Sequence, residues 1–115
     1  MRFTERFKKY ACIGDSISVE IGDLIYNATI QPDFDTRPEY FDCYTEEDVK
    51  RFYEGEWRYI GLVIEAEAHG KTLCDCSIWG VEINLGDDDG LYLMELANDC
   101  LSSVIEDLTL EDTVA

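Results

Sequence analysis

The chain has 115 residues, with 26 Asp and Glu against 9 Lys and Arg, so its formal net charge at pH 7 is -17. A polyanion of this strength is repelled by nucleic acid and by anionic membranes, which argues against both as direct partners and favours a basic surface. Hydrophobic residues make up 46% of the chain without a low-complexity run, which excludes a disordered acidic tail and predicts one folded domain over residues 1–115.

The first ten residues form a basic and aromatic segment, in which Phe3, Phe7 and Tyr10 recur at helical spacing. We therefore expect residues 1–10 to be an N-terminal arm, or a short amphipathic helix, that packs on the domain. The segment lacks the apolar run of a signal peptide, and no stretch approaches the ~20 apolar residues of a membrane span. The sequence thus predicts a cytoplasmic protein.

Residues 16–30 have the pattern of a β-hairpin. Ile17, Val19 and Ile21 alternate with polar residues, which is typical of a half-buried strand. A Gly-Asp turn follows, and residues 24–30 are predicted to form the partner strand.

Residues 31–44 hold both prolines among acidic and aromatic side chains, which is typical of a surface loop. A helix is predicted to begin after Thr45, whose hydroxyl can cap it. Three carboxylates follow directly, and the helix dipole favours them in the first turn. Val49, Phe52 and Tyr53 supply the apolar side of this short helix.

Residues 57–68 form the longest predicted strand, rich in aromatic and β-branched side chains, with Ile60, Leu62 and Ile64 on one face. The chain can turn through a three-residue loop at residues 69–71 and return as a second strand. That register pairs Ala66 with Cys74, Ile64 with Cys76 and Leu62 with Ile78. These pairs together form one continuous apolar face of the hairpin.

The same register places Glu65 opposite Asp75 on the other face of the hairpin. Like charges directly opposite each other destabilise a sheet. We therefore expect this face to be exposed to solvent and available for function.

Asp87, Asp88 and Asp89 precede a glycine and form a predicted polar turn. The apolar residues of the next segment recur with the helical period, which predicts a long helix over residues 91–108. Residues 109–115 are expected to form a loose tail. The elements together predict the α+β class: a single domain whose antiparallel sheet, built from hairpins, packs against a long C-terminal helix, with a second short helix.

No catalytic or metal site emerges from the residue spacing. Cys74 and Cys76 share one strand face about 6.6 Å apart, but a zinc site needs about two further ligands and no other Cys or His is grouped with them. The three aspartates lack the glycine and glutamate of a calcium loop, because Tyr92 and Asn98 occupy those positions. We therefore expect free cysteines, no cofactor, no metal and no enzymatic activity.

Three segments carry a resemblance: residues 39–48 (EYFDCYTEED), 56–64 (EWRYIGLVI) and 77–82 (SIWGVE). They are similar to those of small uncharacterised acidic proteins common in phages and mobile elements. The resemblance implies a phage context and the cytoplasm of a bacterial host, where short acidic proteins often block defence enzymes by imitating nucleic acid. It carries over no catalytic residue.

The leading hypothesis is an inhibitor of a host defence protein that binds nucleic acid, acting by nucleic-acid mimicry as anti-CRISPR or anti-restriction proteins do. Alternate strand residues lie about 6.7 Å apart, on the scale of neighbouring phosphates. The partner would be a basic nucleic-acid-binding protein, and the inhibitor a monomer or homodimer. The predicted partner-binding patch comprises Asp33, Asp35, Glu39, Asp42, Glu46, Glu47, Glu65, Glu67, Asp75, Glu82, Asp87, Asp88 and Asp89.

Two alternatives remain open. The first is a small-molecule or metal-binding domain, or a minor enzyme, that uses the cysteine pair or the loop of residues 31–44. The second is an acidic globular phage protein whose charge serves only its solubility.

Overall fold

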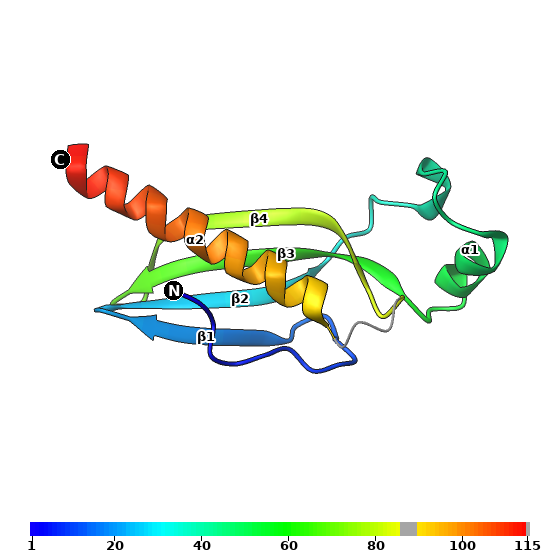
Figure 1. Ribbon diagram of the computed structural model, residues 1–115, viewed down its shortest axis with the longest axis horizontal. Coiled ribbons are helices and arrows are strands. Elements are labelled where there is room, and N and C mark those ends of the chain that lie inside the picture. Colours follow the sequence, from blue (N-terminus) through cyan, green and yellow to red (C-terminus); the bar gives the residue numbers. More distant parts are fainter. Residues whose placement is uncertain (86–89, 115) are drawn as a thin grey trace.

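The computed structural model describes residues 1–85 and 90–114. Four strands form one antiparallel sheet in the order β1-β2-β3-β4, and a long helix, α2, lies diagonally across one of its faces (Figure 1). A short helix, α1, stands beyond one end of the sheet. The elements are β1 (Ser16–Ile21), β2 (Leu24–Pro32), α1 (Glu46–Tyr53), β3 (Arg58–Ala68), β4 (Lys71–Ile83) and α2 (Leu91–Val114). The predicted α+β fold is confirmed.

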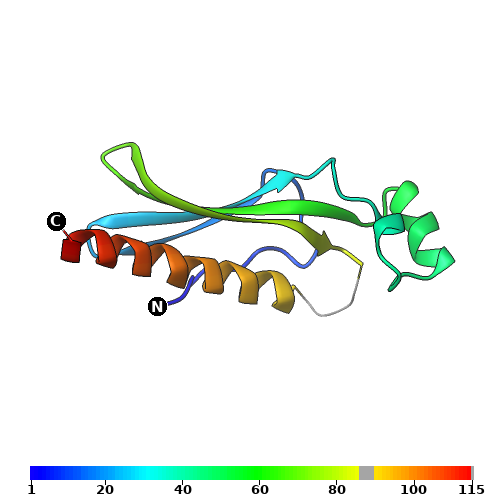
Figure 2. The same ribbon diagram turned by 90° about the horizontal axis from the view of Figure 1, so that it is seen from above.

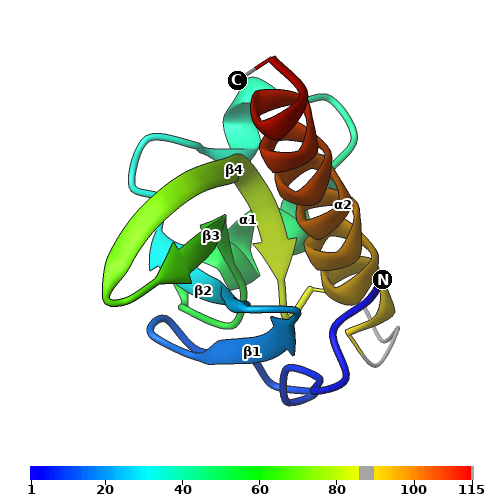
Figure 3. The same cartoon turned by 90° about the vertical axis from the view of Figure 1, so that its left-hand side faces the viewer.

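The main core lies between the sheet and α2. Alternate residues of each strand point to this side, as the period of two predicts, and Leu62 and Ile64 at its centre are fully buried. Helix α2 packs on β3 and β4, and the N-terminal arm lies on the same side of the sheet (Figure 3). The predicted core side chains all contribute, although Cys74, Cys76 and Ile78 are only partly buried.

The first eleven residues form an extended arm, so the alternative of a short helix was wrong. Phe3 and Phe7 are buried in the main core. The backbone N–H of Phe3 donates to Oδ1 of Asn98 at 2.9 Å, and the side chain of Asn84 bonds both the N–H and the carbonyl of Ala11, at 3.2 and 3.0 Å. Side chains from just beyond the end of β4 and from α2 thus supply hydrogen-bond partners for the backbone of the arm, which therefore does not need the hydrogen bonds of a helix.

The β3–β4 hairpin has the predicted register, with Leu62 opposite Ile78. The predicted three-residue loop was wrong. His69 and Gly70 have φ angles of 54° and 78° and form a two-residue loop of the kind that matches strand twist. Leu73 is the extra residue in a β-bulge next to this loop, and it restores the register that the longer loop would have set.

Helix α2 has the predicted apolar side, with Leu101 and Val104 fully buried. Its backbone remains helical to Val114, past the predicted end at residue 108 and through the segment that we expected to be a loose tail. The predicted turn at Asp87, Asp88 and Asp89 lies outside the described residues.

Residues 33–57 form a second structural unit, which we call the α1 module, at the far end of the sheet (Figure 2). Thr45 and Asp48 cap α1 reciprocally: each side chain accepts a hydrogen bond from the other residue's backbone N–H, at 3.1 and 3.2 Å. Trp57 is 1% exposed, and its Nε1 donates to the carbonyl of Asp48 at 2.8 Å.

Six aromatic rings form a small cluster that includes Trp57, and two of them, Phe41 and Tyr44, come from the predicted surface loop, whereas Phe34 and Tyr40 of that loop are exposed. The contacting rings of this cluster have centroids 5.1 to 6.5 Å apart. They belong to Phe41, Tyr44, Phe52, Tyr53, Trp57 and Tyr59. The α1 module extends the molecule to 52 × 25 × 21 Å, with a radius of gyration of 15.8 Å. A compact chain of this length would have about 13 Å, so the protein is distinctly elongated.

Candidate partner-binding surface

The sheet face turned away from α2, which we call the open face, is covered by no helix of the described chain (Figure 2). Its side chains are polar or acidic with a few apolar exceptions, and all are half-buried or exposed. They come from alternate positions of all four strands: Ser16, Ser18, Glu20, Ile25, Asn27, Thr29, Val63, Glu65, Glu67, Asp75, Ser77 and Trp79.

Three predicted site residues come together on the open face. Glu65 lies directly opposite Asp75, as predicted, and Glu67 is the next residue of β3 on the same side. Oε2 of Glu65 accepts a hydrogen bond from Oγ1 of Thr72 at 3.4 Å. None of the three carboxylates forms an ion pair with any residue that the structure describes. Their charge is therefore presented to solvent from a rigid sheet.

Besides Asp33 and Asp35, four other predicted residues lie in the α1 module, at the opposite end of β3 from Glu65. All four are exposed, and Glu39 accepts a hydrogen bond from the Tyr53 hydroxyl at 2.6 Å. From Arg58, where β3 begins, Glu65 is about 23 Å away along the strand. The predicted single patch is therefore divided into two clusters. The module cluster comprises Glu39, Asp42, Glu46 and Glu47.

Asp33 serves the fold. Its carboxylate accepts hydrogen bonds from the backbone of Asp35, Thr36 and Gly80 at 3.0, 3.2 and 2.8 Å, and from the Thr36 hydroxyl at 2.8 Å. Burial alone would raise the pKa of Asp33, but these four bonds together lower it below its ordinary value. The loop after β2 is thereby attached to β4, while Asp35 itself is exposed.

Glu82 also has a structural partner, because its Oε1 accepts a hydrogen bond from the Tyr44 hydroxyl at 2.5 Å. Burial, followed by this bond to a carboxylate, raises the pKa of Tyr44. The hydroxyl of Tyr59, whose ring lies 6.5 Å from that of Tyr44 between centroids, is buried as well. Glu82 thus attaches β4 to the aromatic core of the module. The last three predicted residues, Asp87, Asp88 and Asp89, lie outside the described residues.

Trp79 is the open-face residue that sequence reasoning missed. Its side chain is 53% exposed, although tryptophan is among the most hydrophobic residues in the chain. The signal was present in the sequence: if Cys74, Cys76 and Ile78 point to the core, the next residue must point to the opposite face. Exposed aromatic side chains are enriched at protein interfaces.

The five cysteines differ in their exposure to solvent. Cys12 and Cys43 are exposed, whereas Cys100 is buried beside Cys76 at the contact between α2 and β4. Burial, and then a hydrogen bond to Cys76, raise the pKa of Cys100 to about 12, which keeps its thiol protonated and unreactive. Among the side chains of residues 1–85 and 90–109, no three His, Cys, Asp or Glu are placed to hold a metal ion.

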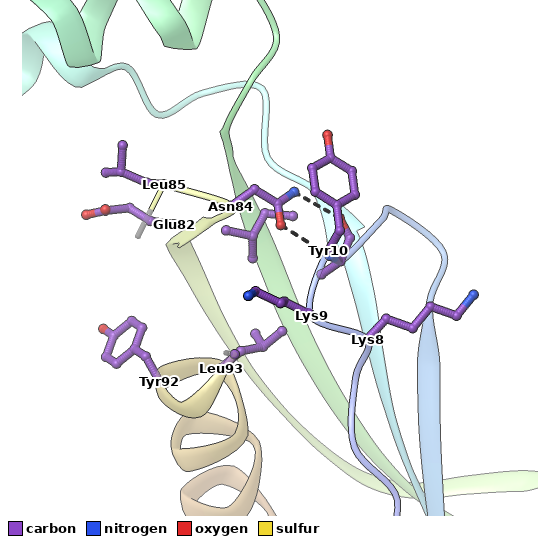
Figure 4. A pocket seen from close by; sticks show the side chains of 11 residues that line it. Lys8, Lys9, Tyr10, Glu82, Asn84, Leu85, Tyr92 and Leu93 are labelled. Carbon is purple, nitrogen blue, oxygen red and sulfur yellow. Dashed lines mark hydrogen bonds between the residues drawn. The ribbon is translucent and has the colours of Figure 1, made fainter. Parts of the chain in front are cut away.

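A pocket of about 490 Å³ lies between the N-terminal arm, the end of β4 and the start of α2 (Figure 4). Lys8, Lys9 and Tyr10 line it from the arm, and Tyr92 and Leu93 line it from the helix. Its volume falls in the range of small-molecule sites. Neither the cysteine pair nor the loop of residues 31–44 lines it, so the residues that we considered for a small-molecule site are not those that form this pocket.

Comparison of the chain with protein-family models, with curated proteins and with solved structures finds no match. The resemblance to phage proteins therefore stays a prediction. Within the described residues, none of the helices combines the length and the apolar character that crossing a membrane requires.

Proposed function

We propose that the protein is a small acidic binding protein that occupies the basic nucleic-acid site of a host defence protein, as an anti-CRISPR or anti-restriction inhibitor does. The observation that supports it best is the set of carboxylates on the open face. Glu65 and Asp75 form a like-charge cross-strand pair that costs stability, and no described cation compensates it. A basic partner would supply that compensation.

The geometry suits mimicry in two respects. Glu65 and Glu67 are alternate residues of one strand, so their side chains leave the sheet about 6.7 Å apart, close to the spacing of phosphates on one nucleic-acid strand. A four-stranded sheet also fixes the backbone from which these side chains project, so no loop has to be ordered when they meet lysine and arginine side chains. The phage context rests on the sequence resemblance alone.

The test is competition with DNA. The purified protein is assayed against a panel of bacterial restriction and CRISPR nucleases, with and without saturating duplex DNA and over a series of salt concentrations. We expect binding to at least one nuclease that DNA abolishes and that weakens steeply with salt. Binding that saturating DNA leaves unchanged would contradict the proposal.

Two matched charge reversals identify the cluster responsible. The double variant Glu65→Lys with Asp75→Lys changes the open face, and the double variant Glu46→Lys with Glu47→Lys makes the same change of charge on α1. Both double variants raise the net charge by the same amount. If the open face binds the partner, the first should abolish binding and the second should weaken it only slightly. Equal effects of the two variants would show that total charge, and not the open face, determines the binding.

A second candidate function is small-molecule binding in the pocket beside Asn84, favoured by its volume of about 490 Å³. Native mass spectrometry of the protein purified from cells would detect a retained ligand. The variant Leu85→Trp, which places a larger side chain at the pocket wall, should then lose the additional mass. A spectrum with the apoprotein mass alone, together with no thermal stabilisation by a metabolite library, would exclude this function.

A further inference from the structure

Trp79 is exposed but has a fixed position on the open face. Its exposed fraction is 53%, against 1% for Trp57, the only other tryptophan. Trp57 contacts several rings of the module core, whereas Trp79 has no ring contact with any described aromatic residue. Its Nε1 donates to Oγ of Ser77 at 3.2 Å, which restricts the rotation of the indole. Half of the indole surface is therefore free to receive a partner.

The strand opposite is built to accept this ring. A Cβ atom added to Gly61 would lie 2.2 Å from two carbon atoms of the Trp79 ring, so the indole occupies the space that any other residue would fill. Gly61 is itself buried under this contact. The indole thus lies directly on the backbone of β3.

A β-bulge sets the direction of Trp79. The pairing of β3 with β4 shifts between Ile60 and Leu62, so that Trp79 and Gly80 together face the single residue Gly61. Gly80 has a φ angle of 72°, which favours glycine, and its N–H donates to Asp33 at 2.8 Å. Two glycines and a partly buried hydrogen bond from the loop after β2 thus fix the position of one exposed tryptophan.

The chemistry of this surface selects the ligand. A fixed indole face attracts a cation, and arginine stacks on it better than lysine because its guanidinium is planar and weakly hydrated. Asp75 projects from the same face of β4 about 13 Å away, and the chain carries a net charge of -17, so cationic partners are favoured over neutral ones. Tryptophan is also among the residues that most often dominate the energy of an interface.

We propose that Trp79 is the anchoring contact of the open face and that it stacks against an arginine side chain of a basic partner protein. This inference rests on the proposed function and specifies which cation the open face prefers. The indole supplies selectivity for arginine, and the carboxylates of Glu65 and Asp75 supply attraction to either cation.

The test compares two fluorescently labelled peptides, nona-arginine and nona-lysine, whose binding is followed by fluorescence anisotropy at one fixed salt concentration. The unmodified protein should bind nona-arginine about 3- to 30-fold more tightly than nona-lysine, from the usual range of cation–π energies. Trp79→Ala should remove that preference and leave the affinity for nona-lysine unchanged. Leu91→Ala, at a residue with 55% exposure on α2, is the matched control and should keep the preference.

A second variant tests the packing of the ring without removing it. Gly61→Ala displaces the indole, so it should lower the preference for arginine, and Trp79→Phe should retain part of it. Circular dichroism checks that each variant is folded.

Equal affinity of the unmodified protein for the two peptides, or an arginine preference that survives Trp79→Ala, overturns the inference. In that case the proposed function stands as long as Glu65→Lys with Asp75→Lys still weakens binding of both peptides. If the unmodified protein binds neither peptide, the proposed function fails as well.

Discussion

Asp33 offers a direct test of how the loop after β2 is held, because its carboxylate joins this loop to β4. Oδ1 accepts from the backbone of Asp35 and Thr36, and Oδ2 accepts from the Thr36 hydroxyl and from the N–H of Gly80. The substitution Asp33→Asn keeps the shape of the side chain. With its NH₂ group at the Oδ1 position the amide faces two backbone N–H donors, and two hydrogen bonds are lost. With the NH₂ group at the Oδ2 position, the Thr36 hydroxyl can turn and accept from it, so only the bond from the Gly80 N–H is lost.

The magnitude follows from the one or two hydrogen bonds lost. A hydrogen bond to a charged group contributes about 1.5 to 3 kcal/mol when buried, and solvent reduces this to about 1 kcal/mol at a half-exposed site such as this one. Asp33→Asn should therefore lower the free energy of unfolding by about 1 to 2 kcal/mol. Urea denaturation followed by the fluorescence of buried Trp57 measures it. Asp35→Asn is the control, since that exposed carboxylate accepts no hydrogen bond from the described residues and the charge change is the same.

The pH dependence has a definite sign. The folded-state pKa of Asp33 is lowered, so its stabilisation is complete above the unfolded pKa of about 3.9 and is lost as the pH falls through the folded value. The difference in stability between the unmodified protein and Asp33→Asn should be constant near neutral pH and shrink below about pH 4. Equal stability of Asp33→Asn and Asp35→Asn at pH 7 would refute the structural role of Asp33.

Three further predictions concern the main core, the thiols and the arm. Leu62→Ala should cost about 2 to 5 kcal/mol in urea denaturation, because Leu62 is fully buried, whereas Leu73→Ala, at a residue with 47% exposure, should cost far less. Titration with a thiol reagent at pH 8 should modify the two exposed cysteines first and Cys100 only on unfolding; rapid reaction of all five would contradict its burial and its raised pKa. Asn98→Ala removes the hydrogen-bond acceptor of Phe3, so trypsin should cleave the basic arm faster; an unchanged cleavage rate would show that the apolar contacts alone hold the arm.

The local pattern of the sequence determined the elements and the pairing of the central hairpin. Alternation along β3 and β4 placed Leu62 against Ile78 and Glu65 against Asp75, because a shift by one residue would move every apolar side chain to the wrong face. The same alternation implied an exposed Trp79. The cap at Thr45 was also readable, because a cap depends on residues within one turn.

The tertiary structure decided what depends on contacts between distant residues. Asn98 and Asn84 fix the arm from across the chain, and Asp33 finds its donor on β4, so none of these roles is visible in local spacing. The division of the predicted acidic patch has the same origin. Glu39, Asp42, Glu46 and Glu47 look equivalent to Glu65 in the sequence, because all are acidic. The α1 module nevertheless places these four carboxylates beyond the end of the sheet, away from Glu65. Charge is encoded residue by residue, whereas the distance between two charges is set only when the chain has folded.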